Sequence, residues 1–163
     1  MKPADLLALL REFYTEKAAL RQRHAAAARH VPNYDFNNTY QYIISREDVQ
    51  LGWLHDAIAS FGGSVEPVAE PSIAAHGKGS DVQASLVRED SAGMQSFYDR
   101  WRERVEKITN ARHRNMLRVI LGETLEQKRF FEQALAGRQD LLGRRGAQVG
   151  PSHGEVLSSR WIE

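Results

Sequence analysis

Residues 3–30 read PADLLALLREFYTEKAALRQRHAAAARH, and this stretch carries the pattern that decides the fold. Its apolar side chains recur at intervals of three, four or seven residues, at Leu6, Leu10, Phe13, Leu20 and Ala27. Such a stripe is typical of a helix that packs one face against a core. Because proline suits a first helical turn and Pro32 cannot continue a helix, we expect a helix from about Pro3 to His30.

The same spacing predicts three more helices. One begins after the Asn33 region and ends at Gly62 and Gly63, where a glycine can terminate it. The next spans about 81–108. The last spans about 111–136, with Thr109 or Asn110 as its N-cap.

Residues 64–80 contain two prolines and two glycines without a sustained period, so we expect a long loop there. Its reach of at most roughly 60 Å exceeds the length of a 26-residue helix, roughly 39 Å. The other two connections are short and favour antiparallel neighbours. We therefore predict an all-α, antiparallel four-helix bundle over 1–137, with a long crossover between the second and third helices. Residues 138–163 are predicted to be a C-terminal tail that packs on the bundle or on a neighbour.

Composition excludes several classes of function. Lys and Arg number 22 against 21 Asp and Glu, so the net charge of +1 lacks the positive field expected of a nucleic-acid or membrane-surface binder. The chain has no cysteine, which rules out disulfides, iron–sulfur clusters and thiolate zinc sites. The first residues suit neither a secretory signal nor a membrane span, so we expect a cytoplasmic protein.

Polar residues interrupt the apolar stripe in the middle of all four predicted helices. They are Lys17, Glu47, Gln50, Asp90, Thr124 and Gln127. If the helices pair as predicted, these residues form one central polar layer. An unpaired buried charge costs several kcal/mol or more, so the layer must be hydrogen-bonded, ion-paired or bound to a metal.

Three stretches resemble the ferritin-like superfamily, and within it the small rubrerythrin-like bundles. They are SREDVQLGWLHDAIASFGG at 45–63, VREDSAGMQSFYDRW at 87–101 and ILGETLEQKRFFEQAL at 120–135. They are similar to the second, third and fourth helices of that family. The resemblance implies a ferritin-like bundle, in which carboxylates and Glu-x-x-His pairs hold two iron or manganese ions.

At the positions that match the family's ligands, most residues differ. Glu47 keeps its carboxylate and Asp90 keeps a shorter one, whereas Gln50 and Gln127 replace the two histidines and Thr124 replaces a glutamate. Amides are poor ligands for first-row transition metals. We therefore expect no metal cofactor.

The central inward position of the first helix is Lys17, whose ammonium would repel a dication. We hypothesise that Lys17 replaces the metal as the counter-ion of Glu47 and Asp90, with the layer's amides and Thr124 completing the hydrogen bonds. A carboxylate left without a cation would have a raised pKa. The alternative is that Lys17 reaches solvent and the layer holds only water.

A carboxylate-only metal site stays open as the rival reading. It would use iron, manganese or magnesium in a rubrerythrin-like oxidase or peroxidase. Its ligands would be Glu16, Glu47, Asp90, Glu123 and Glu126.

Other candidates are better explained by packing or exposure. His55 is interpreted as a surface residue, His113 as part of an exposed basic first turn, and His24 as an inward residue of the first helix. Five aromatic residues are assigned to core packing rather than to an electron path: Tyr40, Tyr42, Phe97, Tyr98 and Trp101.

The sequence thus favours a non-catalytic binding, regulatory or structural module, with a homodimer that buries a helix face as one arrangement. The tail contains Leu-Leu-Gly-Arg-Arg at 141–145, which is weakly similar to peptides that direct some ferritin-like proteins into protein shells. We expect the tail instead to dock on its own bundle or on a second copy.

Overall fold

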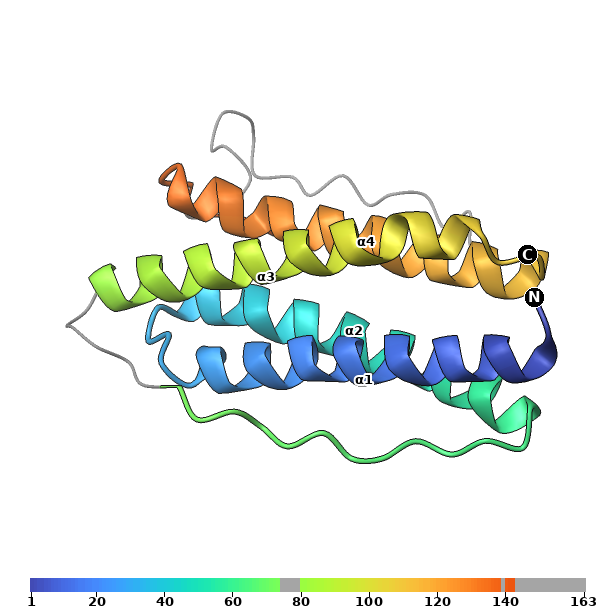
Figure 1. Cartoon of the computed structure of the whole chain (residues 1–163). Coiled ribbons are helices and arrows are strands. Elements are labelled where there is room, and N and C mark those ends of the chain that lie inside the picture. The colour runs from blue at the N-terminus through green and yellow to red at the C-terminus, as the bar shows by residue number, and fades with distance from the viewer. Residues whose placement is uncertain (74–79, 139, 143–163) are drawn as a thin grey trace, which may run out of the picture.

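The computed structural model describes residues 1–73, 80–138 and 140–142, and these fold into four α-helices (Figure 1). The helices are α1 (Pro3–Ala28), α2 (Tyr34–Ser60), α3 (Ser80–Glu106) and α4 (Ala111–Leu135). No strand occurs in the described ranges. The predicted four-helix, all-α fold is confirmed, and each helix begins and ends within about a turn of its predicted bounds.

Two asparagines cap helices that follow short connections. The side-chain oxygen of Asn33 accepts a hydrogen bond from the Phe36 backbone at 2.9 Å, and Asn110 accepts one from the His113 backbone at 3.2 Å. Each bond satisfies a backbone N–H that has no partner within the helix. Of the two predicted caps of α4, Asn110 is the one whose side chain serves.

The helices lie as two pairs, α1 beside α2 and α3 beside α4 (Figure 1). The segment after α2 runs along the α1–α2 pair in an extended course. Three side chains of α1 bind this segment at intervals along the helix. Arg11 donates to the Ser64 carbonyl, and Gln22 donates to the Val68 carbonyl. Arg29 forms an ion pair with Glu70.

Two hydrophobic clusters fill the bundle, one toward each end of α1. The first includes Leu10, Phe13 and Trp101, and the second includes Tyr40 and Phe131, with Leu141 packed against it. The polar layer lies between these clusters along α1.

The end of α2 depends on two consecutive glycines. Gly62 has a φ of 72°, a conformation in which a side chain is strained. A Cβ on Gly63 would lie 2.7 Å from Leu7 Cδ1 and 3.1 Å from the Ile58 carbonyl oxygen. The second glycine is therefore required by the close approach of the chain to α1 and to the last turn of α2.

We expect Gly63→Ala to lower the free energy of unfolding by about 1–3 kcal/mol, because the added methyl overpacks this contact. Gly52→Ala is the matched control, since no atom lies within 4 Å of a Cβ there and alanine favours a helix interior by about 0.5–1 kcal/mol. Urea unfolding of both variants measures the difference. Equal stability of the two variants would contradict the predicted contact.

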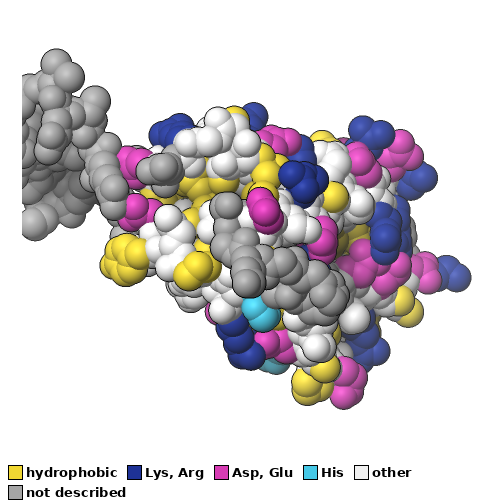
Figure 2. Space-filling view, turned by 90° about the vertical axis from the view of Figure 1, so that its left-hand side faces the viewer, with side chains coloured by type: hydrophobic (Ala, Val, Ile, Leu, Met, Phe, Trp, Pro, Cys, Tyr) yellow, Lys and Arg dark blue, Asp and Glu magenta, His cyan; other side chains and the backbone are white. Residues whose placement is uncertain are grey.

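None of the four helices, over the residues described, is both long and apolar enough to cross a membrane. On the face shown in Figure 2, basic and acidic side chains are interspersed. Among the described residues visible there, charges of one sign do not gather into a large region.

Candidate functional site

All six residues predicted for the central polar layer are buried. Their exposed fractions are between 0 and 3%, for Lys17 of α1, Glu47 and Gln50 of α2, Asp90 of α3, and Thr124 and Gln127 of α4. The helical spacing that predicted their inward direction therefore places each of them inside the bundle.

Lys17 is enclosed by groups from three other helices. Its ammonium donates to Glu47 Oε1 at 2.9 Å and to Thr124 Oγ1 at 3.3 Å, and it lies 5.8 Å from the centre of the Phe97 ring. The Thr124 hydroxyl in turn donates to the Ile120 carbonyl at 2.8 Å. The reading in which Lys17 reaches solvent is wrong, because its exposed fraction is 0%.

His24 binds the other oxygen of the same carboxylate. Its Nδ1 lies 2.9 Å from Glu47 Oε2, so Nδ1 carries the hydrogen and the carboxylate accepts it. His24 Nε2 is buried without a hydrogen-bond partner in the described part of the chain. Both oxygens of Glu47 are thus bound by side chains of α1, seven residues apart.

Burial alone would raise the pKa of Glu47. The His24 imidazole and the Lys17 ammonium outweigh that effect and lower the pKa of Glu47 to about 2. Glu47 is therefore ionised at neutral pH. The raised pKa considered for an uncompensated carboxylate does not apply to it.

This lowered pKa makes stability depend on pH in a defined window. The unfolded chain binds a proton at Glu47 near pH 4.5, whereas the folded chain resists protonation until about pH 2. Stability is therefore fully present above pH 4.5 and falls as the pH drops toward 2, by about 3 kcal/mol for this group.

Chemical unfolding of the wild type and of Glu47→Gln across this range tests the prediction. The stability difference between the two proteins should shrink as the pH falls, because the variant has no carboxylate to protonate at this position. Parallel stability curves would contradict the assignment.

Asp90 has a different set of partners. Its Oδ1 accepts from Arg23 Nε at 2.7 Å, and its Oδ2 accepts from the Tyr40 hydroxyl at 2.5 Å. Burial, followed by the charge of Asp90, raises the pKa of Tyr40, so the hydroxyl stays protonated and donates. The hypothesis that Lys17 balances both internal carboxylates needs correction, because Arg23 is the cation of Asp90.

Gln50 of α2 connects the buried layer to Glu123, a partly exposed residue of α4. It donates to Glu123 Oε2 at 2.5 Å, and Arg46 donates to Glu123 Oε1 at 2.6 Å. The side-chain oxygens of Gln50 and Gln127 are buried without a partner in the described residues. Both amides thus have an unused acceptor.

The outer carboxylates proposed for the rival metal site, Glu16, Glu123 and Glu126, each bind different side chains. Glu16 accepts from Trp101 Nε1 at 2.9 Å, Glu123 is bound as above, and Glu126 is exposed beside Arg129. Within the described ranges, no group of three or more His, Cys, Asp or Glu side chains is placed to hold a metal ion.

Two of the remaining candidates need correction. His113 is buried and packs on Phe61, because the first turn of α4 faces the end of α2 rather than solvent. Tyr42, assigned to the core, is 45% exposed. His55 is exposed beside Asp56, and Trp101 and Phe97 lie in the first hydrophobic cluster.

The sequence did not reveal three side chains as hydrogen-bond donors to these carboxylates: Tyr40, which was assigned to core packing, Arg23 and Arg46. Tyr40 lies seven residues before Glu47, and that interval keeps two side chains on one helix face. A search for polar groups at this spacing would have found Tyr40. The two arginines flank the stripe rather than interrupt it, so periodicity gives no signal for them.

Comparison of the chain with models of known protein families, with curated proteins and with solved structures finds no match. The resemblance to ferritin-like proteins therefore rests on the three quoted stretches alone.

Proposed function

We propose that this chain is a ferritin-like bundle that works without a metal, as a non-catalytic binding, regulatory or structural module. The observation that carries the proposal is the Lys17 ammonium, which lies 2.9 Å from Glu47 at full burial in the central layer. The family resemblance assigns that layer to two metal ions. In this chain, a cation that belongs to the protein takes the place of a metal.

The charge balance of the layer supports the proposal. Each internal carboxylate has its own cation from α1: Lys17 for Glu47 and Arg23 for Asp90. A dication would have to displace these cations and then bind beside the amides of Gln50 and Gln127, which are poor ligands for transition metals. Displacing the two cations and binding beside poor ligands both make metal binding less favourable.

The ferritin-like topology is part of the same proposal. In it, two antiparallel helix pairs are joined by one crossover that runs the length of the bundle. The course of residues 61–73 along the α1–α2 pair in Figure 1 supports this arrangement, as do the short connections at 29–33 and 107–110.

The proposal is tested by thermal unfolding with and without Mn²⁺ or anaerobic Fe²⁺. A metal that binds only the folded state raises its unfolding temperature. We expect no increase for the wild type. We expect an increase for Lys17→Glu, which removes the ammonium and adds a carboxylate beside His24 and Glu47. An increase for the wild type would overturn the proposal and favour the rival di-metal oxidase or peroxidase.

Three expectations about partners and location remain predictions: homodimerisation, docking or shell binding by the tail, and a cytoplasmic location. Within the tail, Leu141 is buried against the second hydrophobic cluster. Residues 139 and 143–163 lie outside the described part of the chain.

A further inference from the structure

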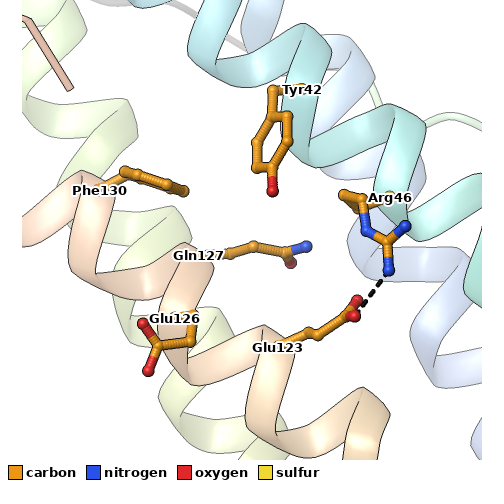
Figure 3. Close-up of a pocket in the computed structure, with 6 residues that line it drawn as sticks. All are labelled: Tyr42, Arg46, Glu123, Glu126, Gln127 and Phe130. Carbon is orange, nitrogen blue, oxygen red and sulfur yellow. Dashed lines mark hydrogen bonds and ion pairs between the residues drawn. The ribbon is translucent and has the colours of Figure 1, made fainter. Parts of the chain in front are cut away.

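A hollow of about 600 Å³ opens between α2 and α4, beside the central layer (Figure 3). Its lining combines one basic and two acidic side chains, an amide and two aromatic rings: Tyr42, Arg46, Glu123, Glu126, Gln127 and Phe130. We propose that this hollow binds a small zwitterion, namely an α-amino acid with an apolar or aromatic side chain. The hollow is lined by none of Lys17, Glu47 and Asp90, the buried charges on which the metal-free proposal rests.

Gln127 contributes a buried amide to the lining of the hollow. This side chain is 3% exposed, and its Oε1 has no hydrogen-bond partner among the described residues. Figure 3 shows the amide between Tyr42 and Glu123, at the centre of the lining residues. Buried polar atoms nearly always have a partner. A ligand ammonium next to this amide, whose oxygen and nitrogen exchange places by rotation, would supply one.

Arg46 and Glu123 place opposite charges side by side in the wall of the hollow. Arg46 uses Nη2 to bind Glu123 Oε1 at 2.6 Å. Its other N–H groups have no hydrogen-bond partner among the described residues and can bind a ligand carboxylate. The two oxygens of Glu123 each accept one bond, from Arg46 and from Gln50, and each keeps a lone pair for a ligand ammonium.

Adjacent opposite charges match a zwitterion better than a simple ion. A simple anion would be repelled by Glu123, and a simple amine would be repelled by Arg46. Glu126 turns its carboxylate away from Arg46 in Figure 3 and pairs with Arg129. It therefore has little effect on which charges a ligand of the hollow must carry. An α-amino acid places both charges within one small group.

Two aromatic rings, Tyr42 and Phe130, form the wall opposite these charges. The Tyr42 and Phe130 rings meet edge to face, with centroids 5.9 Å apart, and Tyr42 is 45% exposed. An apolar or aromatic side chain of the ligand would cover these rings and remove apolar surface from water.

The test is a titration of the ¹⁵N-labelled full chain with L-phenylalanine, followed by NMR. Two matched ligands each lack one charge: N-acetyl-L-phenylalanine lacks the ammonium and phenethylamine lacks the carboxylate. We expect L-phenylalanine to shift the signals of Tyr42, Arg46 and Gln127, and each matched ligand to bind at least about tenfold more weakly, the factor given by losing one charged hydrogen bond.

Arg46→Gln should weaken L-phenylalanine binding by at least about tenfold, by the same arithmetic. Arg118→Gln is the matched control on α4, since Arg118 pairs with Glu106 away from the hollow, and it should leave binding unchanged. The proposal is overturned if L-phenylalanine shifts no signals of the hollow, if the three ligands bind equally, or if Arg46→Gln binds as well as the wild type.

Discussion

We expect Lys17→Met to lower the free energy of unfolding by about 3–5 kcal/mol, because the buried Glu47 would lose its ammonium partner and keep only His24. Methionine is similar in length to lysine and fills the same space, so the loss reports the charge rather than a cavity. Urea unfolding followed by circular dichroism measures it. A loss below about 1 kcal/mol, the value of an exposed ion pair, would contradict the role of Lys17.

Two further variants make this result specific to the buried ion pair. Lys128→Met on α4 removes an ammonium whose partner Glu132 is about half exposed, so we expect a change within about 0.5 kcal/mol. In the double variant Lys17→Met/Glu47→Gln, no uncompensated charge remains. It should therefore be more stable than Lys17→Met alone.

We expect Asp90→Ala to cost about 2–4 kcal/mol, because the variant leaves the buried Tyr40 hydroxyl without an acceptor and opens a small cavity. Asp99→Ala in the same helix is the control. Asp99 is exposed and accepts one bond from Gln95, so its loss should change stability by no more than about 0.5 kcal/mol.

Tyr40→Phe separates the contribution of the Tyr40–Asp90 hydrogen bond from that of the Arg23 ion pair. The double variant Tyr40→Phe/Asp90→Ala tests the coupling of the two side chains. If the hydrogen bond between Tyr40 and Asp90 stabilises the fold, this variant loses less free energy of unfolding than the two single variants lose in sum. Additive losses would show that the two side chains act independently.

The helices could be predicted because the information is local. The apolar spacing of residues 3–30, the Asn110 cap and the positive φ of Gly62 each depend on neighbouring residues only. The burial of Lys17 and Glu47 follows from the same spacing, since both interrupt an apolar stripe at an inward position.

The partners within the layer could not be predicted in the same way. Which cation reaches Asp90 depends on the rotation and height of α1 relative to α3, and periodicity along one helix does not specify these. The sequence therefore favoured Lys17 for both carboxylates, whereas Arg23, at the edge of the α1 stripe, binds Asp90. His113 was misassigned for the same reason, because its burial depends on where α4 meets Phe61.

The central claim is that Lys17 provides the positive charge that a metal provides in the ferritin-like family. The most direct test is the metal content of the wild-type protein, purified without chelators from culture supplemented with iron and manganese and measured by mass spectrometry. Our account predicts far less than one ion per chain. Iron or manganese at one or two ions per chain would contradict it.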